Sequence, residues 1–512
     1  MNMNKKLNIE IDKKIFLSTD LLLKEIKNQK FVLCHGVFDL VHPGHLRQFV
    51  YAKKFAPILV VSVTSDNFIF KDNLRPYVNQ ELRCLNLAHY EIVDYVIVDN
   101  NPKPLKLIQK IKPKYFIKGY EYQKLENKNT KEEKKILNKI KCKFIFSPGD
   151  VVFSSSNFIK SLKPNIKFEK LFTLLRSEKL KIKDLKETVK KFSQLKVSIL
   201  GDTIVDKYSS AVVVGGMHKS PTISVKILEE NYFVGGAAIV AMHVAATGAK
   251  VKFSTMIGND KDSKFIINQF KRIKNIDCNF LHKENRPTTQ KNNIVVDNVK
   301  LLKIDNVDNS LINEEDLSFL LNKNFFNTDG VILSDFRHGI FNNETIPKIS
   351  KFIKNIKFKV ADTQVASRWG NLTDYKNFDL LTPNEKEVRF ALADQDSVIR
   401  PLGYRLMKSI KCKNLFITLG SDGVISIRDK NYTRSSFHLE SLVDKLVDPV
   451  GAGDSFLAYS TLSMMVTKND ISSVILGSIA SKISCEKLGN ITISPQSIFE
   501  YLNKIEIFEK NF

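Results

Sequence analysis

The chain has 512 residues, of which 43% are hydrophobic and 26% charged, a globular composition that excludes a wholly disordered protein. Its length exceeds what a single hydrophobic core usually organises, so we expect at least two domains. The net charge of +24 would suit a nucleic-acid partner, but the sequence has no run of five basic residues and no basic tract interleaved with aromatics. We therefore interpret the charge as lysines scattered over solvated surfaces.

The six cysteines are dispersed along the chain and include no CxxC pair. This spacing argues against a zinc site and against a secreted disulfide scaffold. The first 14 residues lack the apolar segment of a secretion signal, and no apolar run approaches the roughly 20 residues of a membrane span. We expect a cytoplasmic protein without a membrane partner.

Short apolar runs alternate with amphipathic stretches over residues 1–162. The runs predict buried parallel strands at 31–34, 58–63, 95–98, 115–117 and 144–146. The stretches between them predict helices at 43–55, 79–90, 104–111 and 130–140. This alternation predicts a first domain of the doubly wound, Rossmann-like α/β class.

Residues 160–196 hold twelve Lys or Arg against four acidic residues and show no strand pattern. We interpret residues 163–183 as a basic linker rather than a binding tail, and 184–192 as an amphipathic helix that opens a second domain, 184–512.

The second domain resumes the α/β alternation, with strands predicted at 197–200, 251–255, 331–334, 358–361 and 415–419. Apolar and polar residues alternate at 223–227 and in parts of 293–304. A period of two indicates strands with one exposed face, so these segments predict a small additional sheet.

The first chemical motif follows the strand at 31–34 and reads CHGVFDLVHPGH. Pro43 suits the first turn of a helix, and Gly36 and Gly44 allow a phosphate to approach the backbone. His42 and His45 are three residues apart and share a helix face, at an N-terminus that favours anions. Two imidazoles there can donate to triphosphate oxygens and to the charge that develops in nucleotidyl transfer.

This motif resembles the HxGH nucleotidyltransferase superfamily. Arg75–Arg83, Ile117–Tyr122 and Ser154–Asn157 are similar to its heptose-phosphate adenylyltransferase branch. The resemblance implies a transfer helped by His42, His45 and Lys118, without a covalent intermediate and with Mg²⁺ bridging phosphates. It implies nucleotide contacts from Gly36, Phe38, Asp39, Gly44, Ser154, Ser155 and Ser156. The branch favours ATP, while the residues themselves leave CTP open.

The second motif, residues 448–456, reads DPVGAGDSF. Gly451, Ala452 and Gly453 would present backbone N–H groups to a γ-phosphate at the start of a helix. Asp454 is placed to take a proton from a substrate hydroxyl.

The motif resembles the second signature of the ribokinase (PfkB-type) sugar kinases, and the similarity extends over residues 190–505. It implies a ribokinase-like fold in which the small sheet is a β-lid that forms a homodimer. The implied sugar-side residues are Asp202, Asp206, Gly235 and Gly236, and the NxxE element, Asn384 and Glu387, would help to hold Mg²⁺. Gly420 and Gly423 would lie under ATP.

A kinase and a transferase of these branches in one chain resemble the bifunctional enzymes of ADP-heptose synthesis, in which the kinase usually comes first. Such an enzyme phosphorylates a heptose 7-phosphate at C1 and later adenylylates the 1-phosphate. On the substrate side, this chain has Thr222, Ile239, His243 and His338 where those enzymes have other residues. Two alternatives stay open: a CTP-dependent transferase on a polyol or sugar phosphate fused to an independent kinase, and a non-catalytic nucleic-acid-binding or regulatory protein.

Overall fold

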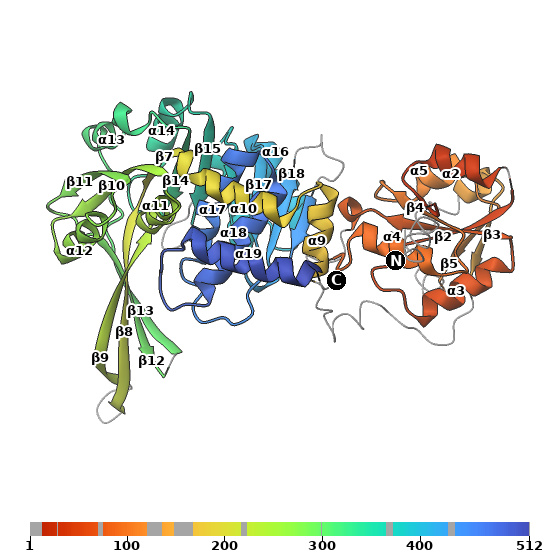
Figure 1. Cartoon of the computed structure of the whole chain (residues 1–512), viewed down its shortest axis with the longest axis horizontal. Coiled ribbons are helices and arrows are strands. Elements are labelled where there is room, and N and C mark those ends of the chain that lie inside the picture. The colour runs from red at the N-terminus through yellow and green to blue at the C-terminus, as the bar shows by residue number, and fades with distance from the viewer. Residues whose placement is uncertain are drawn as a thin grey trace. The chain divides into compact units, whose positions relative to one another are not determined.

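The computed structural model describes residues 13–27, 29–69, 75–119, 136–147, 167–216, 223–297, 299–364, 372–428 and 436–510. The chain divides into two compact units, Met1–Ile166 and Lys167–Phe512 (Figure 1). Within the described ranges, no helix is both long and apolar enough to cross a bilayer.

The first unit is built on a parallel six-stranded sheet of order β1-β4-β3-β2-β5-β6. Its strands are β1 (Ile15–Phe16), β2 (Phe31–Gly36), β3 (Ile58–Thr64), β4 (Tyr95–Asp99), β5 (Tyr115–Lys118) and β6 (Lys143–Phe146). The predicted strands are confirmed, each one or two residues longer than expected. Strand β1 was not predicted, because two half-buried residues form no recognisable apolar run.

Helices cover both faces of this sheet: α2 (Thr19–Ile26), α3 (Pro43–Lys53), α4 (Gln80–His89) and α5 (Leu105–Ile111), with a short 3-10 turn η1 (Asp66–Phe68) after β3. Helices α3 and α4 share one apolar cluster with Val32 and Cys34 of β2, whereas α2 and α5 share another with Phe31 and Leu33. Alternate residues of one strand therefore enter two cores, which confirms the doubly wound class. Of the helix expected at 130–140, the structure describes only residues from 136 on.

The second unit contains a nine-stranded sheet of order β11-β10-β7-β14-β15-β16-β17-β18-β19. Its strands are β7 (Lys196–Gly201), β10 (Lys250–Gly258), β11 (Ile276–Lys283), β14 (Gly330–Asp335), β15 (Phe358–Thr363), β16 (Leu380–Leu381), β17 (Asn414–Thr418), β18 (Val424–Arg428) and β19 (Ser436–Leu439). Pairing is parallel from β11 to β17 and antiparallel from β17 to β19. The five strands predicted here are confirmed.

Two helical layers sandwich this sheet (Figure 1). One contains α10 (Ile182–Lys191), α11 (Ala237–Ala246), α12 (Lys261–Phe270), α17 (Ala452–Thr467), α18 (Asp470–Cys485) and α19 (Pro495–Lys510). The other contains α13 (Glu314–Leu320), α14 (Thr345–Phe352), α15 (Glu385–Leu392) and α16 (Ile399–Ile410). Short 3-10 turns are η2 (Phe192–Gln194), η3 (Lys323–Phe325), η4 (Leu372–Asp374) and η5 (Gly420–Asp422). Ile199 of β7 enters the first core and Leu200 the second.

A second sheet of four strands, hereafter the lid, projects from this α/β body (Figure 1). It has the order β13-β12-β8-β9 and consists of β8 (Thr203–Gly216), β9 (Ile223–Gly236), β12 (Thr289–Val296) and β13 (Val299–Asn306). Strand β8 starts directly after β7, and β9 returns into α11. The small sheet expected from the alternating pattern is thus confirmed, and its base lies at the carboxyl end of β7.

The segment at 163–183, interpreted as a linker, contains helix α9 (Lys167–Ser177). Leu171, Phe172, Leu174 and Leu175 of this helix are buried in the first core of the second unit. The described part of the segment is therefore integral to that unit. Its many lysines obscured an apolar face that only the packing reveals.

Candidate active sites

His42 and His45 lie against each other at the N-terminus of α3, with stacked rings whose centroids are 3.8 Å apart. Nδ1 of His42 accepts a hydrogen bond from the Gly44 N–H (3.1 Å), and Nδ1 of His45 accepts one from the His42 N–H (3.4 Å). In the neutral rings the proton is therefore on Nε2, where it can be donated to an anion. Burial, reinforced by the charge of His42, lowers the pKa of His45 to about 3, so this ring is neutral at pH 7.

The ring of Phe38 packs against this histidine pair. Its backbone is left-handed, with φ 51°, and its buried ring meets the His45 ring edge-on at 5.1 Å between centroids. A Cβ on Gly36 would lie 3.1 Å from the Phe38 ring, so a small residue is needed there. The Phe38 ring therefore holds His45 in place, and the nucleotide contact expected of Phe38 stays a prediction.

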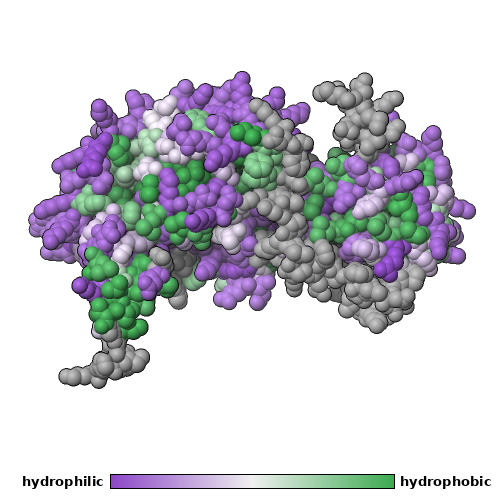
Figure 2. Space-filling model, turned by 60° about the horizontal axis from the view of Figure 1, so that its bottom comes forward, coloured by the Kyte–Doolittle hydropathy of each residue, from purple (hydrophilic) through white to green (hydrophobic). Residues whose placement is uncertain are grey.

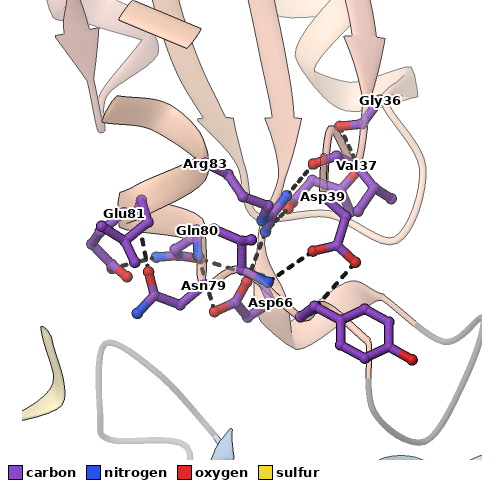
Figure 3. A network of polar contacts seen from close by, with 12 residues as sticks. Gly36, Val37, Asp39, Asp66, Asn79, Gln80, Glu81 and Arg83 are labelled. Atoms are coloured by element: carbon purple, nitrogen blue, oxygen red, sulfur yellow. Dashed lines mark hydrogen bonds and ion pairs between the residues drawn. The ribbon is translucent and has the colours of Figure 1, made fainter. Parts of the chain in front are cut away.

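Asp39 joins the loop after β2 to the segment before α4 (Figure 3). Its two carboxylate oxygens accept hydrogen bonds from the backbone N–H groups of Tyr77 (3.1 Å) and Val78 (2.8 Å). The carboxylate thus faces peptide N–H groups that only the folded loop brings within reach, and the nucleotide contact predicted for Asp39 stays a prediction.

Arg83, a fully buried arginine on α4, ties the same loop to the ends of neighbouring strands (Figure 3). Its guanidinium donates to the carbonyls of Val37 and Thr64 and to the Asp66 carboxylate, the last two at 2.8 and 2.7 Å. Asp66 also accepts from the backbone N–H of Gln80 at 3.2 Å. Arg83 was not among the predicted site residues, although a buried arginine between two carbonyls and a carboxylate fixes the loop that carries the HxGH motif.

Lys118 ends strand β5, which pairs with β2. From β2 the sheet extends through β3 on one side and through β5 on the other. Ligands of open α/β sheets bind outside the carboxyl ends of strands where the order reverses, and Lys118 and His42 both follow such strand ends on either side of this point. Ser154, Ser155 and Ser156 lie outside the described residues.

In the second unit, Gly451 caps the N-terminus of the 16-residue helix α17 with φ 77°, a conformation that favours glycine. No heavy atom lies within 4 Å of a Cβ placed on Gly453, so space is open over this turn. Ala452 begins the helix between them. The predicted glycine-rich turn thus presents a helix N-terminus to a bound anion.

Asp454 lies in the first turn of α17 and is 7% exposed. Its Oδ1 atom is buried and has no hydrogen-bond partner among the residues that the structure describes. Burial, together with the charges of Asp362 and Asp206 and against that of Lys291, raises the pKa of Asp454 to about 8. A basic, poorly solvated carboxylate of this kind suits proton abstraction.

Asp202 and Asp206 flank the base of the lid. Asp202 accepts hydrogen bonds from the backbone N–H groups of Phe336 (2.9 Å) and His338 (3.2 Å) through Oδ2. A Cβ on Gly235 would overlap the Asp206 carboxylate, and one on Gly236 would overlap the Asp202 carbonyl. The two glycines are therefore required by the close approach of both aspartates.

Cations of the lid gather around these carboxylates. Lys291 and Lys303 lower the pKa of Asp206, although burial outweighs them and raises it to about 6. Burial and, to a smaller extent, the charges of Lys291, Arg286 and Lys303 together lower the pKa of His338 to about 3. Sequence reasoning missed Lys291 and Lys303, because the lid sequence is rich in lysine and only the fold shows which lysines lie near the site. It also missed Arg286, which lies in the loop just before β12.

Asn384 and Glu387 form a capping box at the start of α15: the Glu387 N–H donates to Asn384 Oδ1 (3.0 Å), and the Asn384 N–H donates to Glu387 Oε2 (2.8 Å). Glu387 is buried and raises the pKa of Asp362, which burial raises well above its usual value. Asp362 in turn raises the pKa of Asp454. Glu387, Asp362 and Asp454 thus form a series of carboxylates in which each raises the pKa of the next. The series links a predicted metal residue, Glu387, to the predicted base, Asp454.

Gly420 and Gly423 flank the turn η5 after β17, with φ values of 60° and 95°. A Cβ on Gly420 would meet nothing within 4 Å, whereas one on Gly423 would overlap the Leu439 carbonyl. Gly420 is therefore open to a ligand, and Gly423 serves the turn itself.

The comparisons with known proteins follow these two units. The family model "pfkB family carbohydrate kinase" matches residues 196–497, more than half of the chain. The chain belongs to the pfkB family of carbohydrate kinases. A second model, "Cytidylyltransferase-like", matches residues 33–170.

Curated relatives include a bifunctional protein HldE of Haemophilus influenzae, 27% identical over 307 residues, which are 59% of this chain and 62% of the relative. Another, from Sulfurimonas denitrificans, is 26% identical over 313 residues, 60% of this chain and 64% of its own length. The match thus spans less than two thirds of these relatives. Thermotoga maritima ribokinase has the same fold over 60% of this chain and 99% of its own, with TM-score 0.50 and 23% identity.

Proposed function

We propose that this pfkB-family chain is a bifunctional enzyme of nucleotide-sugar synthesis, with a nucleotidyltransferase in residues 1–162 and a sugar kinase in residues 184–512. The observation that carries the kinase half is Asp454, a buried carboxylate with an unpartnered oxygen at the N-terminus of α17. In the reaction, Asp454 takes the proton of a sugar hydroxyl, whose oxygen attacks the γ-phosphorus of ATP. The bond to the bridging oxygen breaks, ADP leaves, and the turn at Gly451–Gly453 stabilises the transferred charge.

The acceptor we propose is itself a phosphorylated sugar, of the heptose 7-phosphate kind. The charges of Lys291, Arg286 and Lys303 all act on His338, and Lys291 and Lys303 also act on Asp206, which supports a cationic environment beside the sugar-side aspartates. The Arg286 guanidinium itself donates to the backbone carbonyls of Asp308, Ser310 and His338. A neutral sugar has no use for such a cluster, whereas a phosphate dianion binds to it strongly.

The carboxylates Asp362 and Glu387 fit a Mg²⁺ requirement, since their mutual repulsion is what a divalent cation relieves. Asn384 and Glu387 would hold the ion and its waters, and it would neutralise the phosphates of ATP. Asp362 was not in the predicted set, and we add it here.

For the transferase half, we propose adenylyl transfer onto a sugar 1-phosphate to give an ADP-sugar. The His42 and His45 rings would donate from Nε2 to the phosphates of ATP, and Lys118 would add a positive charge at the same edge of the sheet. The sugar 1-phosphate oxygen attacks the α-phosphorus, and pyrophosphate leaves.

The test is a screen of D-glycero-D-manno-heptose 7-phosphate, its 1-phosphate and the corresponding hexose phosphates with ATP and with CTP, with products identified by mass spectrometry. We expect an ATP-dependent bisphosphate from the 7-phosphate and an ADP-sugar from the 1-phosphate. A CDP-linked product would support the cytidylyltransferase alternative. Salt-sensitive DNA binding without any turnover would support a non-catalytic role.

The proposal includes a homodimer formed through the lid. The lid displays apolar side chains on its surface (Figure 2), with Leu228, Val299 and Leu302 exposed by 62%, 64% and 56%. Contiguous exposed apolar surface of this kind marks an interaction site, and the same face on a second copy offers an equally apolar partner.

A further inference from the structure

The loop that follows helix α18 is fixed at both ends. The backbone N–H of Gly489 donates to the Asp448 carboxylate at 3.2 Å, and that of Ile493 donates to Nδ1 of the buried His243 at 3.1 Å. The Tyr459 hydroxyl donates to the Ile493 carbonyl at 2.9 Å. His243, which departs from the ADP-heptose synthesis enzymes, therefore anchors this loop and has no place in the sugar pocket itself.

Between these anchors, Asn490 reaches into the kinase site. Its Nδ2 group donates to Asp206 Oδ2 at 2.7 Å. A Cβ placed on Gly451 would overlap the Asn490 amide oxygen, and one on Gly235 would come 3.2 Å from its Nδ2. Asn490 thus lies where the sugar-side aspartate, the di-glycine turn and the anion-binding turn meet.

The amide oxygen of Asn490 is a buried acceptor without a donor among the residues that the structure describes. The orientation of the amide is set by Asp206, because a carboxylate accepts only from the NH₂ side. A buried amide oxygen that accepts no hydrogen bond destabilises the folded protein. A ligand hydroxyl would supply the donor that this amide oxygen lacks, and a sugar is rich in hydroxyl groups.

We propose that Asn490 is a specificity-determining residue of the kinase, whose amide oxygen accepts a hydrogen bond from a hydroxyl adjacent to the one that is phosphorylated. For an aldose phosphorylated at C1, that hydroxyl is on C2. The inference rests on the proposed kinase activity and deepens it, because it names the part of the acceptor that this side chain reads. If Asn490 served only to hold Asp206, its Nδ2 group would be sufficient, and the burial of its amide oxygen without a donor would have no explanation.

The test compares wild type and Asn490→Ala on heptose 7-phosphate and its 2-deoxy analogue, and on D-mannose 6-phosphate and 2-deoxy-D-glucose 6-phosphate. Wild type should prefer the 2-hydroxy sugar of each pair by about tenfold or more in kcat/KM, since a site built to bind a hydroxyl rejects the analogue that lacks it. Asn490→Ala should prefer it by less than about threefold, with an unchanged KM for ATP. A variant that retains the wild-type preference would overturn the assignment.

Two further variants serve as controls for this test. Asn275→Ala removes another asparagine of the same unit, whose Nδ2 donates to the carbonyls of Ala245 and Ala249, and should leave the preference intact. If Asn490→Ala does not fold, Asn490→Ser serves in its place and should show the same loss of preference. A wild type that phosphorylates no sugar would contradict the proposed function, whereas an active wild type indifferent to the C2 hydroxyl would contradict the role of Asn490 alone.

Discussion

Asp454 is a carboxyl group that the fold has removed from water while leaving one of its oxygens unpartnered. Its folded pKa of about 8 lies far above that of an unfolded aspartate, so between pH 4 and 8 the folded state holds a proton that the unfolded state has released. The free energy of unfolding contributed by Asp454 therefore falls as pH rises through that window. The burial that makes Asp454 a suitable base therefore also lowers the stability of the folded protein at high pH.

Asp454→Asn should accordingly stabilise the ligand-free protein at high pH while abolishing sugar phosphorylation. Asparagine resembles the protonated carboxyl, so the gain in melting temperature should be largest near pH 9 and vanish near pH 4. The kinase rate should fall by about 10²- to 10⁴-fold, as for other general bases. Asp396→Asn, at an exposed position, should show neither effect. A stability gain that does not vary with pH would contradict the assigned protonation.

Lys291 is the lid cation that favours the charged form of both Asp206 and Asp454. Lys291→Met should raise the pKa of both carboxyls, so the acidic limb of the kcat/KM profile should move to higher pH. The KM for the sugar phosphate should also rise, because a charge-assisted contact is lost. The exposed Lys226→Met in the same lid is the control, and an unmoved limb in Lys291→Met would argue against the electrostatic role.

At the scale of elements, the HxGH loop depends on a helix that comes later in the chain. Arg83 of α4 satisfies the carbonyls of Val37 and Thr64 and the Asp66 carboxylate, all of which lie in or after strands β2 and β3. The helix therefore acts as a clamp on two strand ends, and the position of the two histidines depends on it.

Arg83→Met should destabilise the first unit by about 3–5 kcal/mol, because it leaves a largely buried carboxylate and two carbonyls without their donor. Denaturant unfolding, followed separately in each unit by hydrogen exchange, should show the loss in residues 1–166 alone. Arg405→Met, which breaks the half-exposed pair with Asp394, should cost less than about 1 kcal/mol. Equal losses in the two variants would show that the network does not hold the loop.

At the scale of the whole molecule, the two candidate sites belong to separate compact units with separate cores. His45→Ala should therefore remove nucleotidyl transfer and leave sugar phosphorylation unchanged, and Asp454→Asn should do the reverse. Both half-reactions are measured on each full-length variant. Parallel loss of both activities in either variant would indicate a single shared site.

The lid is the element that we expect to define the assembly. Leu302 neighbours the site-facing Lys303, and successive side chains of a strand point to opposite faces, so Leu302 faces away from the site. Leu302→Glu with Leu228→Glu should convert a dimer to a monomer in light scattering. Leu311→Glu, an equally exposed leucine outside the lid, should leave the dimer intact. A wild type that is already monomeric at micromolar concentration would contradict the lid dimer.

The sequence by itself determined the α/β class, five of the six strands of the first unit, five of the nine strands of the larger sheet of the second unit, and the two glycine-bearing motifs. These features depend on local sequence. A run of apolar residues predicts a buried strand, and a turn such as Gly451–Gly453 requires glycine for its backbone conformation whatever surrounds it. The sequence did not reveal strand β1, which has only two residues, or helix α9, whose apolar residues are interspersed with lysines.

Only the tertiary structure decided which charges and polar groups meet. Asn490 and Asp206 are 284 residues apart, and no spacing rule links them. Asp39, expected to contact the nucleotide, faces peptide N–H groups, while Arg83, Lys291 and Asp362 emerged as site residues only in the fold. The physical reason is that a buried polar atom is defined by what surrounds it, and the surroundings come from distant segments that packing brings together.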